Sequence, residues 1–211
     1  MNTKKLKKIT KVLKDWLVSI YLYRKNDVDI PVFVLARVDF VFLDSIRAFF
    51  IDEQFIILTE DDIYRGNDVF CLKLLHIKQN STLFYGKDLL STIHIKNSDL
   101  RFMLELEIRN KLIQLREGYL SQNKWKYFLK DLLLGMEIIW EWALWLKNPD
   151  ILLPKKNQEL ISLFDVAWSC NSSAFYYLID DKIDKNKIPQ FIHYVQIYLL
   201  DLCTKINDYK K

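Results

Sequence analysis

Apolar and polar residues alternate most clearly at the start of residues 18–36. Val18, Ile20 and Leu22 alternate with Ser19 and two tyrosines, which is the period-2 pattern of a β-strand. A polar break at 24–26 follows, and residues 28–35 are then almost wholly apolar, as in a strand buried on both faces. The pattern therefore predicts two strands joined by a short polar loop.

The rest of the N-terminal half mixes short helical and extended patterns. Leu6, Ile9 and Leu13 recur at three- and four-residue steps with lysines between them, which predicts an amphipathic helix over 3–16. Such a helix either packs on the sheet or lies on a membrane surface. The remaining patterns predict helices at 40–50 and 60–65, strands at 54–58, 69–77 and 82–85, a helical turn at 88–90 and an extended segment at 92–95.

Helical periodicity predominates after Ser98. Apolar residues recur every three or four positions, and Pro and Gly are too rare to break long helices. The predicted helices cover 99–120, 125–147, 157–168, 172–183 and 189–209. We therefore predict an α+β protein, in which a small mixed β-sheet precedes an all-α helical bundle.

Composition and charge exclude several classes of protein. The chain has 211 residues, a formal net charge of +4 from 31 basic and 27 acidic residues, and only four glycines. This charge is too mild for a clear nucleic-acid footprint, and no glycine-rich phosphate loop occurs. The N-terminus has no apolar segment typical of a signal peptide, and no apolar run is long enough to span a bilayer. Cys71, Cys170 and Cys203 lie far apart, as free thiols in a reducing compartment would, so we expect a cytoplasmic protein.

Two carboxylates stand at the head of the second predicted strand. Asp27 and Asp29 are separated by one residue, so their side chains would project from one face of a strand. Close like charges repel unless a cation lies between them, and Mg²⁺ is the usual hard cation for such a pair. The alternative is structural, because Asp is common where a hairpin loop meets a strand.

In this order, the segments resemble the nucleotidyltransferase-fold family, the polymerase-beta superfamily, and in particular its small prokaryotic members with an appended helical bundle. YLY followed by DVDIPVFVL is similar to the first strand and the Asp-x-Asp strand of that family. Residues 68–90 resemble the segment between its core sheet and its bundle, and 100–120 resemble its first bundle helix. The resemblance implies a truncated nucleotidyltransferase-like domain over 1–95 and a helical bundle over 96–211.

The resemblance also implies which residues would carry chemistry. Family members use a Gly-Ser that opens a phosphate-binding helix, two Asp-x-Asp metal ligands and a third carboxylate from a neighbouring strand. Asp27 and Asp29 match the catalytic, metal-binding pair. The Gly-Ser and about ten following residues are missing, which leaves Arg24 and Lys25 to bind phosphate.

The strand expected to supply the third carboxylate, 70–77, carries no acid. Its positions nearest the metal site are Lys73 and His76, and a lysine there would compete with a cation for Asp27. Arg101, Arg109 and Arg116 of the first bundle helix are further cleft candidates. Alternatively these arginines form pairs within the helix, such as Glu105–Arg109.

Two functions remain open at this stage. The first is a degenerate pseudoenzyme that acts as a binding or interaction module, with a protein partner or a second copy of itself docking through the helical bundle. The second is an active enzyme that binds an NTP and uses Mg²⁺ to transfer a nucleoside monophosphate to a hydroxyl acceptor. The missing Gly-Ser favours the first, and the surviving Asp-x-Asp keeps the second open.

Overall fold

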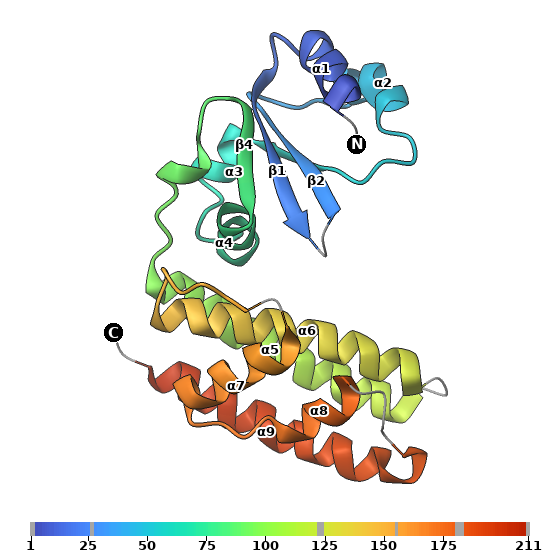
Figure 1. The fold of residues 1–211 in the computed structure, drawn as a ribbon, viewed down its shortest axis with the longest axis vertical. Coiled ribbons are helices and arrows are strands. Elements are labelled where there is room, and N and C mark those ends of the chain that lie inside the picture. Colours follow the sequence, from blue (N-terminus) through green and yellow to red (C-terminus); the bar gives the residue numbers. More distant parts are fainter. Residues whose placement is uncertain (1–2, 26–27, 122–124, 155, 180–183, 210–211) are drawn as a thin grey trace. The chain divides into compact units, whose positions relative to one another are not determined.

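The computed structural model describes the whole chain except residues 1–2, 26–27, 122–124, 155, 180–183 and 210–211. The chain divides into two compact units, Met1–Lys96 and Asn97–Lys211, which are described separately below. The first contains a four-stranded sheet and the second is helical (Figure 1). The prediction of an α+β fold with a mixed sheet followed by a helical bundle is confirmed.

The sheet of the N-terminal unit has the strand order β3-β2-β1-β4. Strand β1 (Leu17–Lys25) pairs antiparallel with β2 (Val28–Leu35) and with β4 (Ser81–Gly86). Strand β3 (Ile56–Thr59) pairs parallel with β2, so the sheet is mixed. Because β1 and β2 are the two central strands, both edges of each are hydrogen-bonded.

Both faces of this sheet are covered by helices (Figure 1). On one face, α1 (Thr3–Val12) and α2 (Phe40–Ile46), with the short 3-10 helix η1 (Arg47–Phe49), pack on Ile20 and Phe33. On the other face, α3 (Glu60–Tyr64) and α4 (Cys71–Gln79) pack on Tyr21 and Val32. Neighbouring residues of each strand therefore enter opposite cores, which explains why β2 is apolar at nearly every position.

The strand predicted over 69–77 is wrong, because this segment forms helix α4. Five of its nine residues are buried: Cys71, Leu72, Leu74, Leu75 and Ile77. A short apolar run of this kind is compatible with either a buried strand or a buried helix, and periodicity does not separate the two. The helical turn predicted at 88–90 lies slightly later, as the 3-10 helix η2 (Leu90–Thr92), and no strand forms at 92–95.

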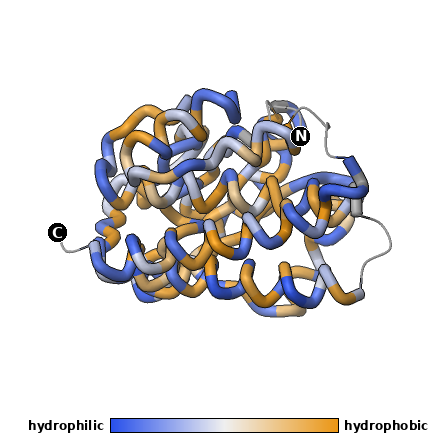
Figure 2. The backbone as a smooth tube through the Cα atoms, turned by 90° about the horizontal axis from the view of Figure 1, so that it is seen from below, coloured by the Kyte–Doolittle hydropathy of each residue, from blue (hydrophilic) through white to orange (hydrophobic). Residues whose placement is uncertain are grey.

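The C-terminal unit contains α5 (Asn97–Ser121), α6 (Trp125–Lys147), α7 (Asn157–Trp168), α8 (Ser173–Ile179), the 3-10 helix η3 (Lys185–Lys187) and α9 (Ile188–Asp208). Helix α5 packs against α6 and α9, and α6 also packs against α7 and α8. Hydrophobic and hydrophilic residues alternate along these helices, as in an amphipathic bundle (Figure 2). In the described residues, no helix combines the length and apolar character needed to cross a bilayer.

Candidate functional site

The predicted carboxylate site lies at the loop end of the β1–β2 hairpin, where the two strands are connected. Arg24 and Asp29 occupy opposing positions in the antiparallel ladder, and Arg24 Nη1 lies 3.3 Å from Asp29 Oδ1. The two side chains are 60% and 48% exposed, so water screens this ion pair. Asp27, the other predicted metal ligand, lies outside the described residues, and Lys25 is described only as the last residue of β1.

The strands on either side of β2 offer no third carboxylate. Strand β3 has the sequence IILT and β1 has the sequence LVSIYLYRK, so neither contains Asp or Glu. Among the residues that the structure describes, no group of three or more His, Cys, Asp or Glu side chains is placed to hold a metal ion. The Arg24 guanidinium contacts Asp29 and so lies where a cation would approach this carboxylate.

Lys73 and His76 lie on helix α4 and not on a strand beside the carboxylates. The Lys73 side chain is exposed. His76 Nδ1 is hydrogen-bonded to the Tyr23 hydroxyl at 2.8 Å, and the two rings meet edge to face. His76 therefore helps to hold α4 on the sheet. The expected competition between Lys73 and a cation for Asp27 involves a residue outside the described set.

The three candidate arginines of α5 occupy different environments. Arg109 donates two hydrogen bonds to Glu105 Oε1, from Nε at 2.9 Å and from Nη2 at 2.6 Å. This is the pair within the helix that the spacing allows, and it raises the pKa of Arg109. Arg101 Nη1 donates to the carbonyl oxygen of Tyr209 at 3.2 Å, whereas Arg116 is exposed. These contacts favour structural roles for Arg101 and Arg109.

A hollow of about 310 Å³ lies between α5 and α6 and is a second candidate for ligand binding. This volume is at the lower end of the range for small-molecule sites. Its charged lining consists of Lys111, Glu117 and Asp131, and Lys111 Nζ lies 3.6 Å from Glu107. The lining carries more negative than positive charge, which disfavours a nucleotide polyphosphate as its ligand.

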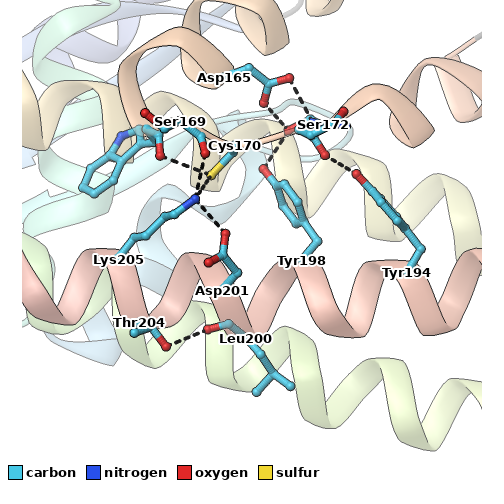
Figure 3. Close-up of polar contacts among 12 residues, drawn as sticks. Asp165, Ser169, Cys170, Ser172, Tyr194, Tyr198, Leu200, Asp201, Thr204 and Lys205 are labelled. Carbon is cyan, nitrogen blue, oxygen red and sulfur yellow. Dashed lines mark hydrogen bonds and ion pairs between the residues drawn. The ribbon is translucent and has the colours of Figure 1, made fainter.

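Sequence reasoning missed a buried chain of polar groups inside the helical unit. Trp140 Nε1 donates to the Tyr198 hydroxyl at 2.8 Å, and this hydroxyl is hydrogen-bonded to Ser172 Oγ, also at 2.8 Å. Ser172 Oγ lies 2.7 Å from Asp165 Oδ1, and the Ser172 N–H donates to Asp165 Oδ2 at 2.9 Å (Figure 3). The chain therefore joins α6, α7 and α9 to the start of α8. Its only sequence signal is the presence of Trp and Tyr in apolar helices, where their polar atoms need partners.

Cys170 and Lys205 extend this polar region toward the surface (Figure 3). Lys205 Nζ lies 2.7 Å from Asp201 Oδ2, donates to the carbonyl oxygen of Ser169 at 2.8 Å and lies 3.5 Å from Cys170 Sγ. Burial raises the pKa of the Cys170 thiol even though Lys205 acts in the opposite direction. Burial also places the pKa of Tyr198 well above its usual value.

These pKa directions define what the cluster can do chemically. Both the Cys170 thiol and the Tyr198 hydroxyl stay protonated at neutral pH, so neither is an activated nucleophile. Lys205 binds Ser169 at the start of the connection between α7 and α8, and Asp165 binds Ser172 at its end. The arrangement therefore positions the α7–α8 connection on α9.

Comparisons with known proteins returned no match among family models, curated proteins or solved structures.

Proposed function

We propose that the chain is a nucleotidyltransferase-like protein that has lost catalysis and acts as a binding or interaction module. The observation that supports this proposal most strongly is the β1–β2 hairpin. Its ladder is continuous up to the pair Lys25–Val28, so only residues 26 and 27 connect the two strands. Two residues are too few for a helix, and the phosphate-binding helix of the resembling family would have to begin at this point.

The backbone around the hairpin is also unavailable to a phosphate. Tyr23 is paired with Ile30 on one side and with Ser81 on the other. The next residue, Arg24, donates its N–H to the carbonyl oxygen of Asn80 at 2.8 Å. Phosphate-gripping loops use backbone N–H groups that are free to point at the ligand, and strand pairing uses up those groups here. The triphosphate of an NTP would therefore be held by side chains alone.

The alternative is an active Mg²⁺-dependent nucleotidyltransferase that moves a nucleoside monophosphate from an NTP to a hydroxyl. The exposed carboxylate of Asp29 is the observation that favours it, because a metal ligand must be reachable. This alternative requires Asp27 to join Asp29 and requires Arg24 to turn from Asp29 toward a phosphate. Under the main proposal Arg24 stays on Asp29, and the interaction partner is a protein that docks through the helical bundle.

Calorimetric titration of Mg·ATP and Mg·GTP into the full chain tests the proposal. We expect no binding by the wild type and no loss of stability in an Asp27→Asn/Asp29→Asn variant. Asp61→Asn is the control, because Asp61 also forms an exposed ion pair, with Arg65 at 3.2 Å. Nucleotide binding that the double variant abolishes and Asp61→Asn preserves would overturn the proposal in favour of the active enzyme.

A further inference from the structure

Helix α5 carries apolar residues on two opposite faces. One face is buried in the helical unit and consists of Leu100, Leu104, Ile108, Leu112 and Leu115. The other face is exposed and consists of Phe102 (65% exposed), Leu106 (42%), Ile113 (50%) and Leu120 (85%), which we call the α5 stripe. At about 100° of rotation per residue, the four members of the stripe fall within about 40° of one another. An exposed apolar stripe of this length is typical of an interaction surface.

The neighbouring helix α9 also carries exposed apolar residues. Arg101 near the start of α5 is bonded to Tyr209 at the end of α9, so the two packed helices run antiparallel. Counting along both helices from this bond brings Ile197 of α9 level with Ile113 of α5. Ile197 and Leu200 are exposed, and Figure 3 shows Leu200 on the side of α9 opposite to Tyr198. Helix α9 therefore carries exposed apolar side chains at the level of the α5 stripe.

We propose that a second copy of this chain docks on the α5 stripe, with the two α5 helices antiparallel about a two-fold axis between positions 110 and 111. The spacing of the stripe supports this arrangement because it is nearly symmetric about that point. The axis places Phe102 against Leu120 of the partner subunit and Leu106 against Ile113 of the partner subunit. A single register of the two helices satisfies both pairings to within about two residues along the helix axis, or about 3 Å.

The charges that flank the α5 stripe fit the same register. Glu105 and Arg116 lie on one flank, about 20° apart around the helix. The two-fold axis keeps this flank on the same side of both subunits and places Glu105 level with Arg116 of the partner subunit. Arg116 is exposed, and both bonds from Arg109 go to Oε1 of Glu105, so the Glu105 carboxylate is shared between Arg109 of its own chain and Arg116 of the partner subunit. Opposite charges therefore meet at both ends of the interface, as complementary docking requires.

The size of the surface is sufficient for a dimer. The α5 stripe spans nineteen residues, or about 27 Å from first to last, and two adjacent helices give a width of about 20 Å. This face of about 540 Å² on each subunit gives about 1,080 Å² for the pair, which exceeds the roughly 1,000 Å² that a biological interface needs. The inference rests on the proposed interaction role, for which it names the partner and the surface.

Sedimentation and light scattering of the full chain, without nucleotide, test the proposal between about 1 and 100 µM. We expect a species of twice the 25.4 kDa monomer mass. Ile113→Glu places a charge in the desolvated centre of the interface and should raise the dimer Kd by about 30-fold or more. Val166→Glu is the matched control, because Val166 is an exposed apolar residue of α7, outside the α5 stripe. A monomeric wild type, or a dimer that both variants preserve, overturns the inference and leaves the calorimetric test of the nucleotide site unaffected.

Cysteine cross-linking tests the orientation independently of any loss of folding in Ile113→Glu. In the antiparallel dimer, position 102 meets position 120 of the partner, whereas two copies of position 102 lie about 25 Å apart. A mixture of Phe102→Cys and Leu120→Cys chains should therefore form a disulfide-linked dimer on mild oxidation, and each variant alone should not. The wild type, with Cys71 and Cys203 buried, provides the background. Cross-linking of Phe102→Cys to itself, or no cross-linking in the mixture, contradicts the antiparallel arrangement.

Discussion

The polar groups at the loop end of the β1–β2 hairpin differ from those inside the helical unit in burial and therefore in energetic weight. Arg24 and Asp29 are both about half exposed, and an ion pair in water contributes between about 0 and 1 kcal/mol. Tyr198 and Ser172 are buried, and leaving such a group unsatisfied costs about 1–3 kcal/mol. Substitution of the residues that resemble a catalytic motif should therefore cost little stability, whereas the buried network, which resembles no motif, holds the helices together.

Substitution of Tyr198 should give the largest effect. Tyr198→Phe removes the acceptor of the buried Trp140 N–H and the partner of Ser172, so we expect a loss of about 3 kcal/mol in the free energy of unfolding. Five of the six tryptophans lie in the C-terminal unit, so urea unfolding followed by tryptophan fluorescence reports mainly on this unit. Tyr177→Phe makes the same chemical change at an exposed position and should leave the midpoint unchanged. A loss below about 1 kcal/mol for Tyr198→Phe would show that the buried chain is energetically as weak as the exposed ion pair.

A buried hydroxyl in the N-terminal unit should give the next largest effect. The Tyr21 hydroxyl accepts hydrogen bonds from the N–H groups of Leu89 and Leu90, at 2.6 and 3.1 Å, and is bonded to Asp88 Oδ1 at 3.1 Å. Tyr21→Phe leaves the Leu90 N–H unsatisfied and leaves the Leu89 N–H only the carbonyl oxygen of Lys87, so we expect a loss of about 2 kcal/mol. Amide hydrogen exchange should show faster exchange at 89 and 90 and little change in α6. Unchanged protection at both amides would mean that burial of the ring, and not the hydroxyl, holds this segment.

The pH dependence of stability tests whether burial also gives a carboxyl group energetic weight. Burial, together with the charge of Glu141, raises the pKa of Glu137 above its usual value of 4.5. Because the folded state holds the proton more tightly, the helical unit should lose stability as the pH rises from about 4.5 through the raised pKa of Glu137. Glu137→Gln should flatten this part of the profile, measured by urea unfolding with tryptophan fluorescence. An unchanged slope in the variant would assign the pH dependence to other groups.

The sequence predicts the long elements of this fold better than the short ones. Helices at 125–147 and 157–168 have the predicted bounds, because a 3.6-residue period sustained over several turns leaves little ambiguity. The segment 69–77 was predicted as a strand and is helical, because burial on most sides removes the periodicity that would distinguish the two. The same reasoning assigns Lys73 and His76 to a strand, whereas they lie on helix α4.

The buried chain could not be predicted because its members come from different elements. Trp140 lies on α6, Asp165 on α7 and Tyr198 on α9, and only tertiary packing brings their polar atoms together. In contrast, the opposition of Arg24 and Asp29 follows from a two-residue connection between adjacent strands. Local chain geometry is therefore visible in the sequence, and long-range polar contacts are not.

Substitution of Asp29 should give the smallest change in stability, and the sign of this change tests the function of the hairpin end. Asp29→Asn removes only a screened ion pair, so we expect the free energy of unfolding to change by no more than about 0.5 kcal/mol, as in the control variant Asp61→Asn. Urea unfolding of both variants in parallel measures this change. A clear gain in stability for Asp29→Asn alone would mean that Asp27 repels Asp29, which is the state of a metal-binding pair without its metal. A clear loss would mean that the pair with Arg24 has become structural, so the sign of this small change separates a lapsed site from a working one.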